Sequence, residues 1–247
     1  MFGFTKRLPV SEAERLWVDK GFARLEKLLS REPLLRAQVV LPNESFFPDP
    51  YDGSKASVAA MAARIAEISG VSSDAFVVEI FAEGEEAWRR SIPLWNGKTN
   101  DAAGLYFHHT DEGRHTIGVH AKYLREPILL VATLAHELAH VLLLGGGLLD
   151  REAEDMEPLT DLATVYLGFG FFAASASFHF KQWSDGGLQG WSAQRIGYLS
   201  EQVLGYALAR FCRERGEHKP MWVKTLPTNV RAYFKASAAW LQARSLQ

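Results

Sequence analysis

The sequence predicts an α+β protein that is mostly helical, with a small antiparallel or mixed sheet beside one very apolar helix. Three observations predict this class. Long segments carry apolar residues at helical spacing, with Ser, Pro or Gly at their ends. Short runs of β-branched and aromatic residues between turn residues are typical of strands. The most apolar helical segment contains the sequence His136-Glu137-Leu138-Ala139-His140.

Two helices are predicted before the first strand. Residues 11–31 have an apolar face, and Ser11 with Glu14 forms a capping box that marks the start. Residues 54–69 follow a loop rich in proline and end before a glycine, so they form the second helix.

The sheet is predicted from three runs. The last two are expected to pair through a turn around Gly113, because that turn lies between two alternating segments. The runs are residues 77–81, 105–107 and 115–120.

The motif helix is predicted over residues 127–144. Pro127 suits the first turn of a helix, and a cluster of glycines follows its end. On a helix, residues four apart lie on one face, so His136 and His140 can reach the same metal ion. Glu137 lies beside them, where it can act as a general base. Polar groups in so apolar a helix need partners, and a metal is the simplest one.

Three further helices are predicted, at 157–180, 192–215 and 228–245. An acidic linker, residues 148–156, precedes the first of them. Residues 162–180 carry no fixed charge and approach the length of a membrane span. They are also rich in small residues that suit close packing between helices. We therefore favour a protein outside the membrane.

The third metal ligand is sought downstream of His140. The metzincin arrangement would need a histidine six residues later, where Gly146 stands. Most of the acidic linker is typical of a solvated segment. Glu157 and Asp161 differ from it, because their spacing places two carboxylates on one face of a helical turn.

With these residues the chain resembles the gluzincins, the thermolysin-like zinc peptidases. The resemblance implies zinc on His136, His140 and Glu157, with Asp161 as the hydrogen-bond partner of His136. Asp161 as the ligand itself is the alternative, as in aspartate-liganded zincins. The sequence also resembles an uncharacterised bacterial family that carries H-E-x-x-H. This second resemblance is in the runs Phe46-Phe47-Pro48-Asp49-Pro50-Tyr51-Asp52-Gly53, Glu157-Pro158-Leu159-Thr160-Asp161 and Gly197-Tyr198-Leu199-Ser200-Glu201.

The resemblance implies a single zincin-like domain over residues 1–247. Its expected parts are an N-terminal helical subdomain (1–70), the sheet with the metal-binding helices (71–180) and C-terminal helices (181–247). In zincins an edge strand runs along the cleft above the metal and pairs with an extended peptide. We expect residues 115–120 to be that strand, and the alternative is an ordinary hairpin in an α+β domain.

Peptide hydrolysis also needs a donor to the oxyanion of the attacked carbonyl. The candidates are His179 and four residues of the helix predicted over 192–215, namely Arg195, Tyr198, Gln202 and Tyr206. We select Tyr198 and His179, although Tyr198 and Tyr206 are both more typical of packing residues. His115 and His120 are interpreted as strand positions and not as ligands.

Composition and net charge indicate which classes of function and which compartment suit the protein. A net charge of −2 with no basic stripe argues against nucleic-acid binding. The single cysteine, Cys212, and a start without a signal peptide favour the cytoplasm. The sequence thus predicts a zinc metallopeptidase (a hydrolase) acting on a peptide or protein substrate. The alternative is a regulatory zinc-binding protein that binds a partner protein without turnover.

Overall fold

The computed structural model describes residues 8–82, 104–107, 113–184 and 199–244. The described part of the chain is mostly helical with a three-stranded sheet, so the α+β class is confirmed. Contacts within the chain define two compact units. One is continuous, residues 41–156, and the other joins residues 1–40 to residues 157–247.

The continuous unit contains the sheet. Strand β3 lies in its centre, where it pairs in parallel with β1 and antiparallel with β2. Phe76 is opposite His115 in the parallel pair, and Gly104 is opposite Val119 in the antiparallel pair. The elements of this unit include α3 (Lys55–Ser69), β1 (Phe76–Phe81), β2 (Gly104–Phe107), β3 (His115–His120) and α5 (Pro127–His140).

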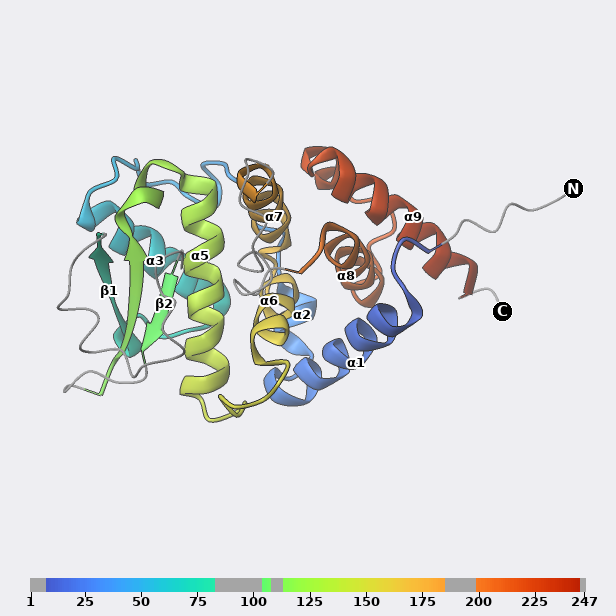
Figure 1. Ribbon diagram of the computed structural model, residues 1–247, viewed down its shortest axis with the longest axis horizontal. Helices are drawn as coiled ribbons and strands as arrows, with labels where there is room; N and C mark the ends of the chain where they lie inside the picture. Colours follow the sequence, from blue (N-terminus) through green and yellow to red (C-terminus); the bar gives the residue numbers. More distant parts are fainter. Residues whose placement is uncertain (1–7, 83–103, 108–112, 185–198, 245–247) are drawn as a thin grey trace, which may run out of the picture. The chain divides into compact units, whose positions relative to one another are not determined.

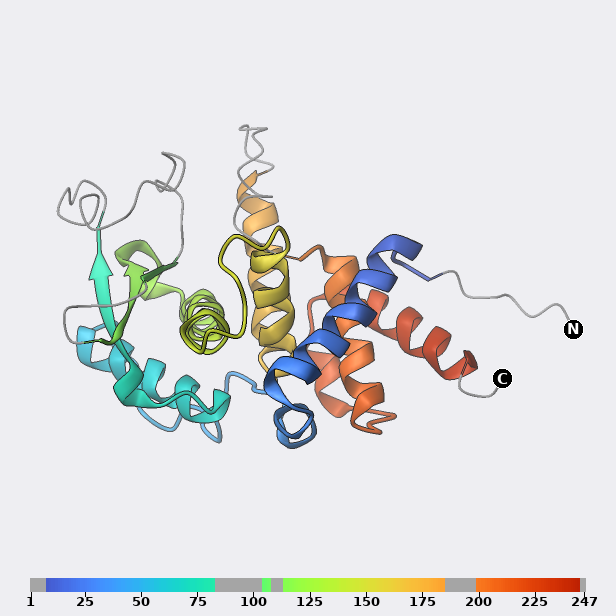
Figure 2. The ribbon, with the colours of Figure 1, turned by 90° about the horizontal axis from the view of Figure 1, so that it is seen from below.

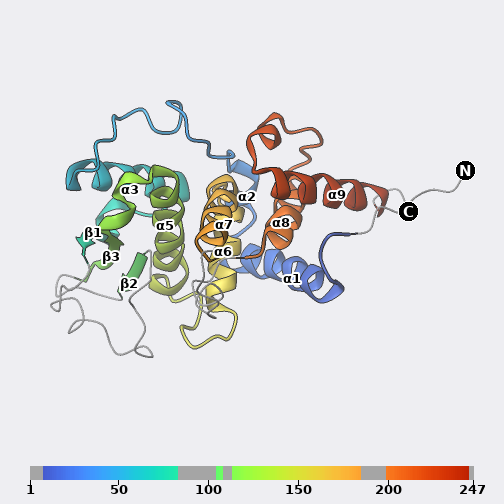
Figure 3. The same ribbon diagram turned by 45° about the horizontal axis from the view of Figure 1, so that its top comes forward.

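Helices α3 and α5 pack against the sheet and against each other (Figure 1, Figure 3). The start of α3 is fixed by Ser54, whose side chain accepts a hydrogen bond from the Ser57 backbone, and Gly70 ends the helix with a φ of 73°. Apolar side chains from α3, the sheet and α5 form the core. Those with no exposed surface include Val58, Ala62, Ile65, Ile117, Val119, Leu130, Leu134 and Leu138.

Helix α5 changes its winding directly after the second motif histidine. The α-helix ends at His140, and residues Val141–Gly145 form one turn of π-helix. Pro127–Gly145 is long and apolar enough to cross a membrane, but 78% of its most apolar window is buried within the protein. Such burial is typical of a core helix.

In the second unit, the regular secondary structure of the described residues is all helical. Helix α8 contacts α1, α2, α7 and α9, and Figure 2 shows it between α1 and α9. Its helices are α1 (Glu12–Leu29), α2 (Glu32–Arg36), α6 (Met156–Tyr166), α7 (Gly170–Ser184), α8 (Glu201–Glu214) and α9 (Thr228–Arg244).

The capping box predicted for the first helix is confirmed. The Ser11 hydroxyl accepts a hydrogen bond from the Glu14 backbone, and the Glu14 carboxylate accepts one from the Ser11 backbone. Further along α1, Asp19 accepts hydrogen bonds from Arg15 at 2.8 Å and from the Tyr206 hydroxyl of α8 at 2.9 Å. The bond from Tyr206 joins two segments that are far apart in the sequence.

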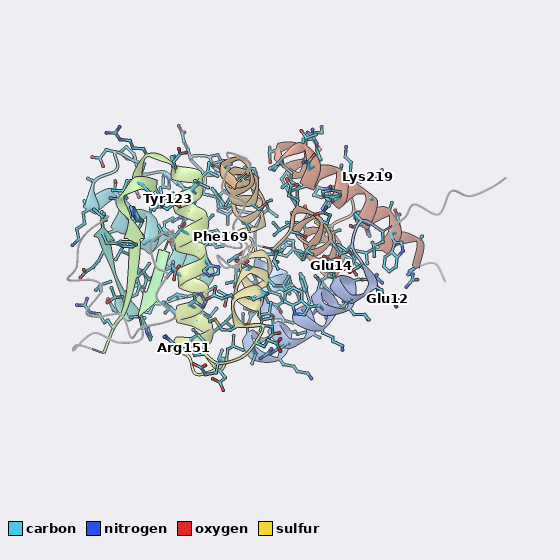
Figure 4. All side chains as sticks on the ribbon, in the orientation of Figure 1. Glu12, Glu14, Tyr123, Arg151, Phe169 and Lys219 are labelled. Carbon is cyan, nitrogen blue, oxygen red and sulfur yellow. The ribbon has the colours of Figure 1, made fainter. Side chains whose placement is uncertain are left out.

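The prediction of one helix over residues 157–180 is wrong, because Gly168 interrupts it. Gly168 has a φ of 97°, and a Cβ there would lie 2.2 Å from the backbone oxygen of Gln38. The Gly168 carbonyl in turn accepts a hydrogen bond from the Val40 backbone at 2.9 Å. Phe169, labelled in Figure 4, follows with 1% of its surface exposed. Only glycine suits this turn, and α6 and α7 are separate helices.

The helix predicted over 192–215 is α8, and it starts later than predicted. Leu199 and Ser200 are not helical, and Ser200 caps α8 by accepting a hydrogen bond from Val203. The last helix, predicted over 228–245, is confirmed as α9.

Candidate metal centre

Helix α5 brings the two motif histidines together. Their rings are nearly perpendicular, with centroids 4.6 Å apart, and their Nε2 atoms are 2.9 Å apart. Two ring nitrogens this close can both reach one metal ion. His140 is 4% exposed and His136 is half-buried. The local cause is the four-residue spacing on a regular helix, which places both rings on one face.

Glu157 completes a group of three. One nitrogen from each histidine and one carboxylate oxygen of Glu157 all lie within 4.8 Å of one another, and this group could hold a metal ion. Glu157 is in the first turn of α6. Two imidazole nitrogens and one carboxylate oxygen are the donor set of several catalytic zinc sites, in which a fourth position stays open. The residues present therefore suit a metal ion.

The chain between the two helices is built of turns. After the π-helical turn, the backbones of Leu148 and Leu149 both donate to the Leu143 carbonyl, at 2.9 and 3.0 Å. The Asp150 side chain accepts from the Glu152 backbone, and Met156 donates to the Ala153 carbonyl. The acidic linker thus makes defined backbone contacts up to the residue before Glu157.

Glu137 lies in the interior of α5, with 6% of its surface exposed. The sequence predicts it as the general base, and its place beside His136 in the same helical turn is compatible with that prediction.

Asp161 lies one helical turn after Glu157 and is 5% exposed. Its Oδ2 accepts a hydrogen bond from the Leu199 backbone at 3.1 Å, and its backbone carbonyl accepts one from the Thr164 hydroxyl at 2.7 Å. Asp161 therefore holds the residue that precedes the cap of α8. Sequence reasoning missed this bond, because nothing local connects two residues 38 positions apart. The pairing of Asp161 with His136 stays a prediction.

The side chains of both predicted oxyanion donors lie outside the described part of the structure. Tyr198 lies outside the described residues. His179 belongs to α7, and its side chain is outside the description. Tyr206, interpreted as a packing residue, is fully buried and donates to Asp19, and burial together with the Asp19 charge raises the pKa of its hydroxyl. Tyr206 is therefore committed to the contact between α8 and α1.

The strand expected at the sheet edge is in the centre. Residues 115–120 form β3, which has β1 on one side and β2 on the other, so the prediction of an edge strand is wrong. The reason is that residues 76–81 pair in parallel with β3, a long-range contact that the sequence pattern does not specify. The antiparallel pairing of residues 104–107 with β3 is confirmed.

His115 and His120 lie on β3 as predicted, and neither belongs to the group of three. A Cβ on Gly145 would lie 2.6 Å from the His115 Nε2, so the ring of His115 packs directly on the π-helical turn. The Nδ1 of His120 accepts a hydrogen bond from the Lys122 backbone at 3.1 Å, which caps the 3-10 helix Ala121–Arg125. Both are 8% exposed or less.

Comparison of the chain with protein-family models, with curated proteins and with solved structures gives no match. The function must therefore be argued from the geometry of the site.

Proposed function

We propose that the protein is a zinc-dependent metallopeptidase. The observation that carries this proposal is the group formed by His136, His140 and Glu157, with Glu137 in the same helical turn as the histidines. A structural zinc site is usually closed by four protein ligands, whereas three ligands of this kind are typical of a catalytic site. A glutamate beside the metal is needed only if a proton must be moved.

Each residue has one task in this proposal. His136, His140 and Glu157 hold the ion. Bound zinc lowers the pKa of a water molecule to about 7 and polarises a carbonyl group. The Glu137 carboxylate takes a proton from the attacking water and delivers it to the nitrogen of the leaving amine. Burial of Glu137 in an apolar helix keeps bulk water away from that proton.

The test compares the zinc-loaded protein with its Glu137→Ala variant on a mixed peptide library, read by mass spectrometry. We expect the wild type to cleave and the variant to bind zinc but not cleave, with a loss of activity of about 100-fold or more. The control is Glu154→Ala, because Glu154 is exposed in the linker.

Two outcomes contradict the proposal. Full activity of Glu137→Ala would exclude the base. Zinc binding by both proteins with cleavage by neither would favour a regulatory zinc protein.

A further inference from the structure

A buried hydroxyl lies on the metal face of α5, one turn before the motif. Thr133 is 2% exposed, and its Oγ1 is closed off from solvent without a hydrogen-bond partner among the described residues. At 3.6 residues per turn, Thr133 lies within about 20° of His140 and about 40° of Glu137 around the helix axis. It therefore shares the stripe of the helix that carries the metal-binding histidines.

Several other helical hydroxyls among the described residues make a hydrogen bond of a kind that Thr133 lacks. Thr164, Ser175 and Ser177 each donate to a backbone carbonyl three or four residues earlier, at 2.7–3.1 Å. A threonine within a helix commonly makes that bond, whereas the Thr133 hydroxyl makes none within the part of the chain that the structure describes.

An unsatisfied hydroxyl in the core has an energetic cost. Leaving it without a partner destabilises the folded protein, and valine would fill the same volume without that cost. The neighbours of Thr133 in α5 are apolar, including Leu130 and Leu134 with no exposed surface. A buried hydroxyl in such a place indicates either a strained group or a bound molecule that the chain does not supply.

We infer that the Thr133 hydroxyl binds a buried water molecule that also hydrogen-bonds the Glu137 carboxylate. Residues four apart on a helix have Cβ atoms about 5–6 Å apart, a gap that one water molecule bridges. A buried water needs two to four polar partners. The hydroxyl and the carboxylate supply two, because a hydroxyl can donate or accept and a carboxylate accepts. Thr133 is then a positioning residue, which acts on the base through the water.

The role of Thr133 in catalysis rests on the proposed function, but the presence of the bound water does not. The first test is therefore thermal unfolding of the zinc-loaded protein in a double-mutant cycle of Thr133→Val and Glu137→Ala. With the water present, Thr133→Val leaves it with one partner fewer and lowers Tm by about 2–4 °C. In the Glu137→Ala background the water has already lost its acceptor, so Thr133→Val leaves Tm unchanged or raises it.

The matched control is Ser237→Ala. Ser237 is also fully buried and has a hydroxyl without a partner among the described residues, but it lies on α9. Removal of its hydroxyl should raise Tm equally in both backgrounds. Thr133→Ser keeps the hydroxyl, so its effect on Tm should be the same with Glu137 present and with Glu137→Ala.

Equal effects of Thr133→Val in both backgrounds would overturn the inference, whichever sign they have. A crystal structure of the zinc-loaded protein gives a second measurement. A water within hydrogen-bond distance of both side chains supports the inference, and a dry contact overturns it. Neither measurement uses peptide cleavage. Suppose that no peptide in the library is cleaved, but that the effect of Thr133→Val on Tm differs between the two backgrounds. That result would contradict the proposed function and support the bound water.

Discussion

At the scale of single residues, helix geometry converts sequence spacing into chemistry. His136 and His140 are four apart on a regular helix, which places both rings on one face, and their Nε2 atoms lie 2.9 Å apart. The sequence could predict this pair with no knowledge of the fold. The prediction of Glu157 as a ligand also needed the resemblance to the gluzincins, because the approach of Glu157 to the histidines depends on the turns of the linker.

The role of Glu157 can be tested by metal affinity. We expect Glu157→Ala to lose bound zinc, because two imidazoles alone hold the ion weakly. Asp161→Ala should reduce the affinity by about 10–100-fold, as is typical for an outer hydrogen-bond partner. The measurement is competition with a chelator of known affinity, and Glu154→Ala is the control. Full retention of zinc by Glu157→Ala would assign the third ligand to another residue.

At the scale of elements, local signals predicted the helices well and long-range contacts less well. Ser11 and Glu14 lie within one helical turn, so their capping box could be recognised directly. The break at Gly168 could not, because it depends on the carbonyl of Gln38, which is distant in the sequence. The prediction of an edge strand at residues 115–120 was wrong for the same reason, since the parallel pairing of β3 with β1 has no local signature in the sequence.

The turn between α6 and α7 gives a prediction about stability. Gly168→Ala places a side chain on a backbone with φ of 97° and against the Gln38 carbonyl. The strained backbone and the overpacking together should lower the free energy of unfolding by about 2–4 kcal/mol. Urea denaturation measures it. The control is Gly216→Ala, with φ of 67° and nothing within 4 Å, which should show only the smaller backbone cost. Equal losses would mean that the Gln38 contact is unimportant.

At the scale of the whole molecule, one unit is assembled from both ends of the sequence. The described residues of 8–40 pack with those of 157–184 and 199–244, and the bond between Tyr206 and Asp19 spans 187 positions. The sequence pattern could not predict this, because helical periodicity shows which face is apolar and not which partner covers it. The other unit is continuous and contains both motif histidines.

Metal binding should be visible as a change in the stability of the whole chain. A ligand that binds only the folded protein adds about 2.7 kcal/mol at a concentration one hundred times its Kd. For a chain of this size this corresponds to a rise in Tm of about 5–10 °C. Scanning calorimetry with zinc, and again after chelation, measures it. The double variant His136→Ala/His140→Ala should show no rise, and an equal rise in that variant would place the ion elsewhere.

The π-helical turn at Val141–Gly145 also bears on which sequence changes this fold can accept. A π turn uses more residues than an α turn. Deleting one residue from this segment would leave the two histidines four apart but rotate everything after them. Gly145 would then no longer meet the ring of His115. The length of the segment is therefore a stricter requirement than the identity of its leucines. Apolar substitutions there should be tolerated, whereas single insertions and deletions should not.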